Sequence, residues 1–435
     1  MSFLLIAVTG LFYFLICLRR FDFFSVAFFS ACVYFLPGFW GYTVVPVGVA
    51  NFAIVDLEDQ SYLVMISVLL VICIGAVIFD QILISNAPVS SKKEAEVAAL
   101  LAVIMGVVGY VLIILTAKEI LLDEDKNRVM QSLNRWYILG ATAAPVAAVL
   151  AFTSKRWSLF LISMILLLFD VYIGFRTSFA IALIACFTLY LSRCGAQRVA
   201  VQNWRLGIIG LLCVCFLFVY KQLYMAVKLG LWDMIIDRLY DAELYTSALL
   251  MSEPFNTQAI LNEVVAQDFR VGMGHLKDVA LQLLLFSPDL AGPPVSFNDL
   301  FQATLFPSDL DYGMANNIWA EMLSSGGWPL LSLFLLCFIG LIAVGSYVIC
   351  CGDLTLAVGA AVAFSYWTFY IHRNDLIYQV NLEKRTLLVW GACWLLAKAV
   401  TLQGASPRSI IRRDVEDTAK RRMPDRPLPA SDYTS

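Results

Sequence analysis

The chain has 435 residues, of which 60% are hydrophobic and only 14% are charged. A soluble domain carries roughly 45–50% apolar and about 25% charged residues, so this chain has too few polar groups to cover a surface in water. The formal charge of −3 gives no indication of a nucleic-acid partner. The composition therefore excludes an ordinary soluble protein and indicates that much of the surface faces lipid.

Cysteine and histidine usage gives no indication of a metal site or a disulfide framework. The 11 cysteines are scattered, most of them lie within apolar runs, and none forms a Cys-x-x-Cys pair. Cysteines of this kind pack as small hydrophobic side chains. With only 2 histidines in the chain, we expect neither a metal nor another cofactor.

Apolar runs follow one another along most of the chain. A helix that crosses ~30 Å of hydrocarbon needs roughly 20 mainly apolar residues, and such runs predict an all-α polytopic membrane protein with about eleven transmembrane helices. The first run ends in Arg19 and Arg20 and has no small-residue cleavage site, so we expect a retained helix. The runs lie at residues 2–18, 21–40, 61–84, 97–117, 136–153, 157–175, 177–192, 207–223, 328–350, 355–371 and 386–402.

Basic residues in the connections predict the orientation, because cytoplasmic loops of membrane proteins are enriched in Lys and Arg. Alternate connections carry this excess, and so does the C-terminal tail. We therefore expect the N-terminus on the outer side of the membrane and the C-terminus in the cytoplasm. The basic connections hold Arg19, Arg20, Lys92, Lys93, Lys155, Arg156, Arg193, Arg198 and Arg205.

The same pattern divides the chain into four parts. Residues 1–220 hold helices 1–8, residues 221–327 form a large loop on the outer side, residues 328–402 hold helices 9–11, and residues 403–435 form a proline-containing tail that we expect to be disordered. Long loops with their own structure are usually functional. Three stretches of the loop carry apolar groups at helical spacing, and we expect them to supply helices that cap the membrane surface. These stretches are 233–250, 257–266 and 274–286.

Arg176 interrupts an apolar stretch that otherwise runs from Ser158 to Ser192. That stretch is too long for one span, so we expect two helices that meet at Arg176 at the outer membrane interface. A guanidinium group binds phosphate in a bidentate manner, so this position suits a diphosphate. The alternative is an arginine whose charged end reaches the lipid headgroups.

Further ionisable and polar residues lie in the other predicted outer segments. His372, Arg373, Asp375 and Arg385 crowd the predicted outer loop 371–385, where the alternative to a binding site is a solvated turn with internal salt bridges. Arg238, Arg270 and His275 lie in the large loop, where the alternatives are surface arginines and a structural histidine. Asn316 and Glu321 precede a Gly326-Gly327 break, and they either contact a sugar or cap a helix.

At these residues the chain resembles the O-antigen polymerase family, the Wzy-type polymerases of oligosaccharide repeat units. Gly174-Phe175-Arg176-Thr177 resembles the family's Gly-x-Arg turn, and the stretch from Asn316 through Glu321 to Gly326-Gly327 resembles the family's segment before its next span. Two further similarities concern arginines. Arg373 in His-Arg-Asn-Asp-Leu, with Arg385 beyond it, resembles the outer turn near the family's C-terminus, and Arg238 falls where members have an arginine early in the large loop.

The resemblance implies a metal-independent glycosyltransferase of class C type. Its donor is a glycan on undecaprenyl pyrophosphate, its acceptor is a second lipid-linked unit, and a flippase and a chain-length regulator are the implied partners besides membrane lipids. Arg176, Arg238 and Arg373 are expected to hold the diphosphate, and Glu321 or His275 to orient or deprotonate the acceptor hydroxyl. The further substrate-binding candidates are Arg270, Asn316, Asp375 and Arg385.

Three other functions remain alternatives. An O-antigen ligase shares the layout and the donor but joins a finished glycan to a lipid A core. A transporter or flippase concentrates ionisable groups near the bilayer midplane, whereas here they concentrate at one face and no internal repeat is present. A non-catalytic scaffold would tolerate replacement of Arg176, Arg238 and Arg373.

Overall fold

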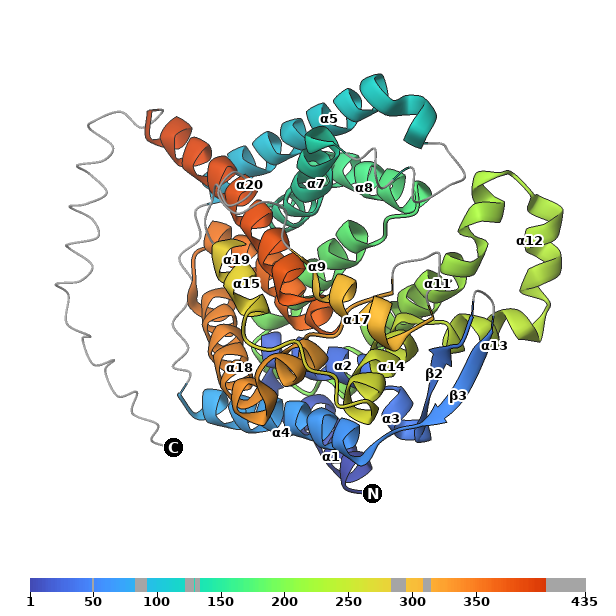
Figure 1. Ribbon diagram of the computed structural model, residues 1–435. Helices are drawn as coiled ribbons and strands as arrows, with labels where there is room; N and C mark the ends of the chain where they lie inside the picture. Colours follow the sequence, from blue (N-terminus) through green and yellow to red (C-terminus); the bar gives the residue numbers. More distant parts are fainter. Residues whose placement is uncertain are drawn as a thin grey trace, which may run out of the picture.

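The computed structural model describes residues 1–48, 51–82, 92–121, 129, 134–282, 295–307 and 314–403, and it is mostly helical (Figure 1). Each predicted apolar run falls on a helix. Six of these helices are long and apolar enough to cross a membrane, namely α4, α5, α7, α18, α19 and α20, and the others are shorter. Their bounds are α1 (Ser2–Ile16), α2 (Phe23–Tyr34), α4 (Asp59–Ile82), α5 (Lys92–Leu121), α7 (Arg135–Thr153), α8 (Trp157–Tyr172), α9 (Thr177–Arg193), α11 (Trp204–Lys228), α18 (Ile318–Cys351), α19 (Leu354–Phe369) and α20 (Leu376–Gln403).

The helices form a bundle whose centre holds α2 and α19. Helix α19 contacts α2, α7, α9, α18 and α20, and most of its residues are buried. Helix pairs approach closely where one partner has a glycine, as at Gly345 beside Phe364 and Gly359 beside Trp390. The outer helices expose large aliphatic side chains, for example Leu336 on α18. In a membrane-embedded chain, this exposed apolar surface faces lipid.

Contacts between distant connections define one end of the bundle, here called the basic end. Strand β1 (Arg19–Arg20) pairs antiparallel with β4 (Ala196–Gln197), so two predicted cytoplasmic connections lie side by side. The buried Arg19 side chain also forms a salt bridge with Asp80 at the end of α4, with 3.0 Å between Nε and Oδ2. Arg156, after α7, pairs with Glu96 at the start of α5. These contacts support the predicted grouping of the basic connections, while the side of the membrane they face stays a prediction.

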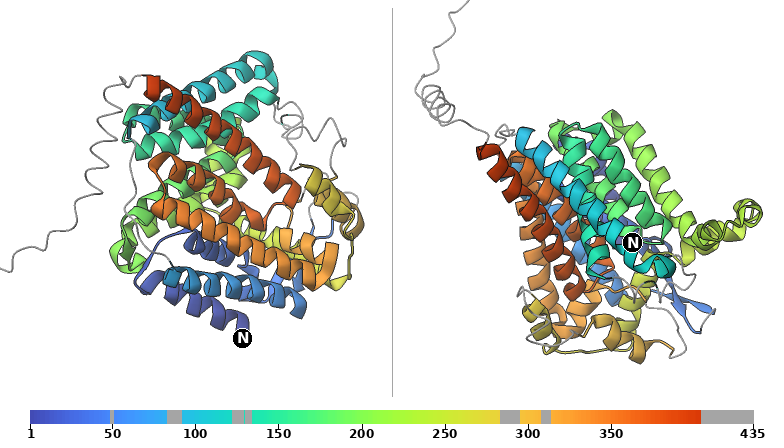
Figure 2. Two further views of the ribbon diagram at one scale, coloured as in Figure 1. Left: turned by 90° about the vertical axis from the view of Figure 1, so that its left-hand side faces the viewer. Right: turned by 90° about the horizontal axis from the view of Figure 1, so that it is seen from above.

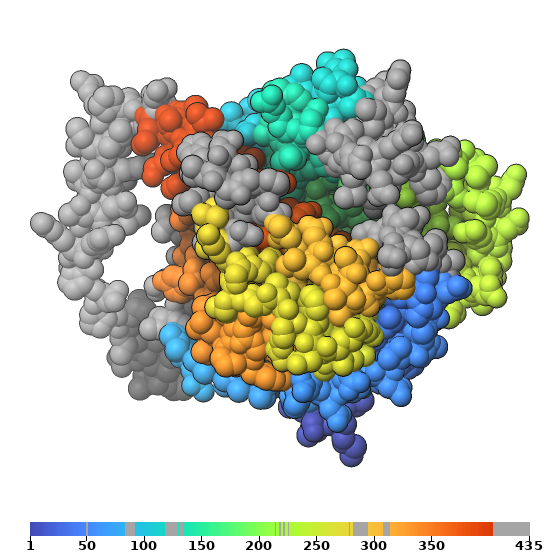
Figure 3. Space-filling model, viewed as in Figure 1, coloured from blue at the N-terminus to red at the C-terminus, as the bar shows by residue number. Residues whose placement is uncertain are grey.

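The opposite end, here called the loop end, carries the helices of the large loop (Figures 1 and 2). In a space-filling view, the yellow to orange segments of this region cover the middle of the face turned to the viewer (Figure 3). Residues 404–435, on which the expectation of a disordered tail falls, lie outside the described residues. The loop-end helices are α12 (Trp232–Leu239), α13 (Ala242–Leu250), α14 (Glu253–Ala266), α15 (His275–Gln282) and α17 (Phe297–Leu305).

The structure places α14 differently from the expected cap on the membrane surface. Its residues Phe255, Gln258 and Leu261 are fully buried, and the helix packs against α2, α4 and α18. It also contacts a hairpin of β2 (Tyr42–Pro46) and β3 (Phe52–Asp56), where the Thr43 hydroxyl donates to the carbonyl of Phe255 at 2.9 Å. The stretch 257–266 is therefore part of the protein core, because most of its residues are buried and Asn262 bonds to Ser61 and Asp56 on neighbouring elements instead of facing water.

Helix boundaries also differ at three places. Helix α11 continues to Lys228, so the large loop begins later than residue 221. Helix α18 begins at Ile318, ten residues before the predicted run at 328, and α20 begins at Leu376 instead of 386. Arg385 accordingly lies within a helix and not in an outer loop. The predicted runs for α18 and α20 begin too late because the first turns of both helices contain polar residues that are buried and bonded inside the protein.

The expected break at Gly326-Gly327 is present inside α18. Gly326 has φ −148° and ψ 16°, and Gly327 has φ 65° and ψ −160°, a conformation that is accessible essentially to glycine alone. The break separates a buried segment, Ile318–Ser325, from the long apolar part of the helix. It turns the residues around Glu321 toward the loop-end helices.

Replacing Gly327 with alanine should lower the unfolding free energy by about 1–3 kcal/mol, the cost of a strained non-glycine backbone. Gly340→Ala is the matched control in the same helix, because a Cβ there meets no atom within 4 Å. The control should leave stability unchanged or raise it by up to about 1 kcal/mol. Thermal unfolding of the purified proteins in one detergent measures both, and equal midpoints would contradict the strained-glycine assignment.

Candidate functional site

The turn that presents Arg176 is built by the end of α8. The N–H of Phe175 donates to the carbonyl of Asp170 at 2.9 Å, and the N–H of Gly174 donates to that of Val171 at 3.0 Å. This pair of bonds is a Schellman motif, and it needs a left-handed residue, which Gly174 supplies with φ 101°. Helix α9 starts directly afterwards at Thr177. Arg176 therefore divides the apolar stretch into two helices, as the sequence predicts.

Arg373 lies in the short connection between α19 and α20. A 3₁₀ turn, η1 (Tyr370–His372), precedes Arg373. The carbonyl of Arg373 accepts the N–H of Asn316 at 2.8 Å. Its guanidinium group lies over the ring of Tyr370, with 5.3 Å from Cζ to the ring centroid. Burial opposes the charge, but the carboxylate of Glu253 together with the neighbouring Tyr34, Tyr370 and Tyr378 outweighs it, so the pKa of Arg373 lies above its usual range. The connection thus holds a fixed positive charge.

Arg176 and Arg373 converge on the carboxylate of Glu253, the first residue of α14. Arg373 Nη1 is 2.5 Å from Glu253 Oε1, and Arg176 Nη2 is 3.6 Å from the same oxygen. The hydroxyl of Tyr34, at the end of α2, donates to Glu253 Oε2 at 3.4 Å. The side chain of Arg176 is 21% exposed, that of Arg373 is 28% exposed and that of Glu253 is 22% exposed. We call Arg176, Arg373 and Glu253 the arginine site.

A second polar cluster joins α15 and α17 to the membrane helices. His275 Nε2 lies 2.7 Å from Glu321 Oε1, and the other oxygen of Glu321 accepts the N–H of Leu376 at 2.8 Å. Asp375 caps α20 by accepting the N–H of Tyr378, and its second oxygen accepts the N–H of Phe297 at 3.1 Å. Burial raises the pKa of the Asp375 carboxyl, and these two N–H groups offset part of the rise.

Burial and bonding in this second cluster fit a structural role. Glu321 is fully buried and the His275 side chain is nearly so. The carboxylates of Glu321 and Asp375 both accept backbone N–H groups that would otherwise be buried without a partner. The catalytic roles of Glu321 and His275 stay predictions. Among the described residues, no group of three or more His, Cys, Asp or Glu side chains could hold a metal ion.

The remaining predicted residues are dispersed. Arg238 is exposed on α12, at the edge of the molecule in Figure 1, and Arg385 is exposed on α20. Arg270 pairs with Asp268 and donates to the carbonyl of Leu323 at 3.0 Å, which ties the segment after α14 to α18. Asn316 lies beside Arg373 through the backbone bond described above. The structure thus brings together two of the three arginines expected at the diphosphate.

Sequence reasoning missed Glu253, Tyr34 and the packing of His372. Glu253 is one of many acidic residues in the large loop, and no local spacing links it to either arginine. His372 is fully buried, and its Nδ1 accepts the indole N–H of Trp319 at 3.1 Å. Its ring also stacks on Tyr34, with 5.3 Å between centroids. For Glu253, the sequence Ser252-Glu253-Pro254 could have indicated the start of a helix, because proline is favoured in the first turn.

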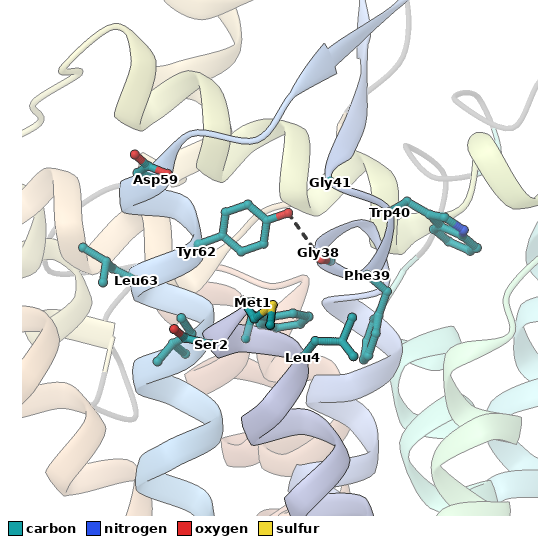
Figure 4. Close-up of a pocket in the computed structure, with 12 residues that line it drawn as sticks. Met1, Ser2, Leu4, Gly38, Phe39, Trp40, Gly41, Asp59, Tyr62 and Leu63 are labelled. Atoms are coloured by element: carbon teal, nitrogen blue, oxygen red, sulfur yellow. Dashed lines mark hydrogen bonds between the residues drawn. The ribbon is translucent and has the colours of Figure 1, made fainter.

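A cavity of about 570 Å³ lies at the N-terminal ends of α1 and α4, beside the short helix α3 (Pro37–Trp40). Figure 4 shows the aromatic side chains of Phe39, Trp40 and Tyr62 around it, and Tyr62 donates to the carbonyl of Gly38 at 3.3 Å. Arg176, Arg373 and Glu253 do not line this cavity. One residue that lines the cavity, Trp40, contacts α14, because its ring stacks on Phe255 with 5.7 Å between centroids.

Comparisons of the chain with protein-family models, with curated proteins and with solved structures give no match.

Removing His275 should destabilise the loop end, because Glu321 would keep its burial and lose its side-chain partner. Breaking a buried pair by deleting one member costs about 3–5 kcal/mol, so His275→Ala should lower the unfolding midpoint strongly. Lys277→Ala, at an exposed position on the same helix, is the control and should change little. The measurement is thermal unfolding in detergent. Equal midpoints for the two variants would show that the pair contributes no stability.

Proposed function

We propose that this chain is a membrane glycosyltransferase that polymerises undecaprenyl-pyrophosphate-linked oligosaccharide units at the periplasmic face of the bacterial inner membrane. The observation that carries the proposal is the convergence of Arg176 and Arg373 on Glu253. The sequence singles out these two arginines by separate arguments, since one interrupts an apolar run and the other lies in a basic outer connection. They come from connections far apart in the chain, and one carboxylate contacts both.

Two guanidinium groups at one place suit a diphosphate ligand. Arginine keeps its charge at any physiological pH and forms paired hydrogen bonds with phosphate oxygens. The arginine site has two positive side chains and one negative, so an anion with more than one charge is a better partner than a single carboxylate. Because the three side chains are partly exposed, a diphosphate can reach the arginines and replace Glu253 as their partner. Fixed donors of this kind stabilise the charge that develops as the bond to the leaving group breaks.

The reaction is a substitution at the anomeric carbon of the donor glycan. The bond between that carbon and the diphosphate oxygen breaks, and its electron pair leaves with the undecaprenyl diphosphate. The acceptor hydroxyl oxygen forms the new glycosidic bond and gives its proton to a base. Once the diphosphate binds the arginines in place of Glu253, that carboxylate is the group beside the reaction that can take the proton. Glu253 thus joins Glu321 and His275 as a candidate base.

Replacing either arginine of the site should abolish polymer formation. Arg176→Ala and Arg373→Ala each remove one charge-assisted contact to the leaving group, and we expect a loss of at least ~10²-fold, as for removal of one oxyanion donor. Lysine at either position should restore part of the activity, because it keeps the charge without the paired geometry. The measurement is the length distribution of lipid-linked glycan made by purified protein in vesicles.

Arg135→Ala is the matched control, because Arg135 is an exposed arginine at the first position of α7. It should retain full activity at equal membrane levels. Unchanged long-chain product in Arg176→Ala or Arg373→Ala would remove that arginine from the mechanism. Loss of product in Arg135→Ala as well would point to a general effect of surface charge.

Deletion of the chain in its own cells distinguishes a polymerase from an O-antigen ligase. Without a polymerase, a single repeat unit still reaches the cell surface on its carrier, so we expect lipopolysaccharide with one unit. Without a ligase, no glycan would be attached at all. Gel analysis of surface lipopolysaccharide gives the result, and complete absence of attached glycan would replace the polymerase proposal with the ligase.

A further inference from the structure

Helices α12 and α13 form a hairpin that packs on the last turns of α11. The contact consists of a small apolar cluster of Leu223 and Ala226 on α11 with Ile235 on α12 and Leu244 on α13. Figure 2, right, shows the hairpin projecting sideways from the helix bundle, coloured yellow-green. Only one side of each helix is used for this contact. The rest of the α12–α13 hairpin surface therefore faces the surroundings of the protein.

The exposed side of α12 is apolar along one continuous arc. At 100° per residue, Trp232, Ile236 and Leu239 fall within about 60° of one another. Their side chains are 62%, 53% and 40% exposed. Asp233 and Asp237 fall together on the other side of the helix. An apolar side that carries tryptophan, isoleucine and leucine beside a charged side gives α12 the amphipathic character of a helix that lies in a membrane interface.

The apolar surface of α12 continues the lipid-facing surface of α11. Along α11, Ile208, Leu212 and Phe216 are exposed, and in a membrane-embedded bundle they meet acyl chains. The helix ends at Lys228, and the exposed Leu229 and Leu231 lead directly into α12. In a chain whose α11 crosses the bilayer, α12 begins where the chain leaves the hydrocarbon. A helix that starts there lies at the depth of the headgroups, where tryptophan is enriched.

We infer that the α12–α13 hairpin is an interfacial anchor that binds the lipid surface. Trp232, Ile236 and Leu239 lie at the boundary of the acyl chains, and Asp233 and Asp237 face water. A second copy of the chain fits less well, because the apolar arc continues a surface that faces lipid along α11. Of the three loop stretches expected to supply membrane-surface helices, the first contains this anchor in α12, while α14, from the second, belongs to the core.

The anchor has a consequence for the arginine site. Gly174 lies against Tyr224 near the end of α11, where an added Cβ would be 3.5 Å from the tyrosine ring. The turn that carries Arg176 therefore rests on the part of α11 that continues into the α12–α13 hairpin. Lipid binding by α12 fixes the depth at which Arg176 lies relative to the headgroups.

A pair of neighbouring cysteine variants tests the anchor. Ile236→Cys and Asp237→Cys place a thiol on the two sides of α12, and both positions are exposed in the protein alone. Each is reconstituted at one copy per phospholipid nanodisc and treated with a charged, membrane-impermeant maleimide, with the parent chain and its 11 cysteines as background. We expect the Ile236→Cys thiol to react at least ~10-fold more slowly, because lipid excludes the reagent from one side only.

Every outcome of this experiment decides the proposal. Equal reaction rates in the nanodisc would place both sides in water and overturn it. Protection of Ile236→Cys in densely reconstituted vesicles but not in single-copy nanodiscs would assign the surface to a second copy and also overturn it. An independent readout is quenching of tryptophan fluorescence by phospholipids brominated near the headgroup. The quenched fraction should fall in Trp232→Phe, and an unchanged fraction would contradict lipid contact.

Discussion

Glu253 lets two positive side chains occupy one place at the loop end of the bundle. Like charges held about 4 Å apart near a protein surface repel by ~4 kcal/mol, and Arg176 and Arg373 both contact the same carboxylate oxygen. The carboxylate removes most of that repulsion and holds both side chains in place. It is also the start of α14, the helix that fills the centre of the loop end. The same residue therefore begins a core helix and brings the two arginines together.

The connection between α19 and α20 unites the two polar clusters. Within five consecutive residues, His372 bonds Trp319, Arg373 pairs with Glu253, Asp375 binds the start of α17, and the N–H of Leu376 binds Glu321. These four bonds join three helices, α14, α17 and α18, to the same short segment. The arginine site thus rests on a rigid support, which is what a group must have to stabilise developing charge without reorganising.

Hydropathy alone predicted where the helices lie, because crossing hydrocarbon imposes a long apolar run. It missed the starts of α18 and α20, where Glu321 and Asp375 are buried by pairing with residues far away in the sequence. The Arg176 turn was predictable, since a glycine and a charge interrupt a run that is too long for one span. Glu253 was not predictable, since its role depends on contacts between α14, α9 and the α19–α20 connection that no local spacing encodes.

The pairing of β1 with β4 ties the order of synthesis to the order of assembly. Arg19 and Arg20 form their ladder with Gln197 and Ala196, so the turn after the first helix has no strand partner until the ribosome has passed that second turn. The intervening helices are therefore synthesised before the first two can take up their final packing. The amino-terminal half therefore completes its packing only after its later segments have been made.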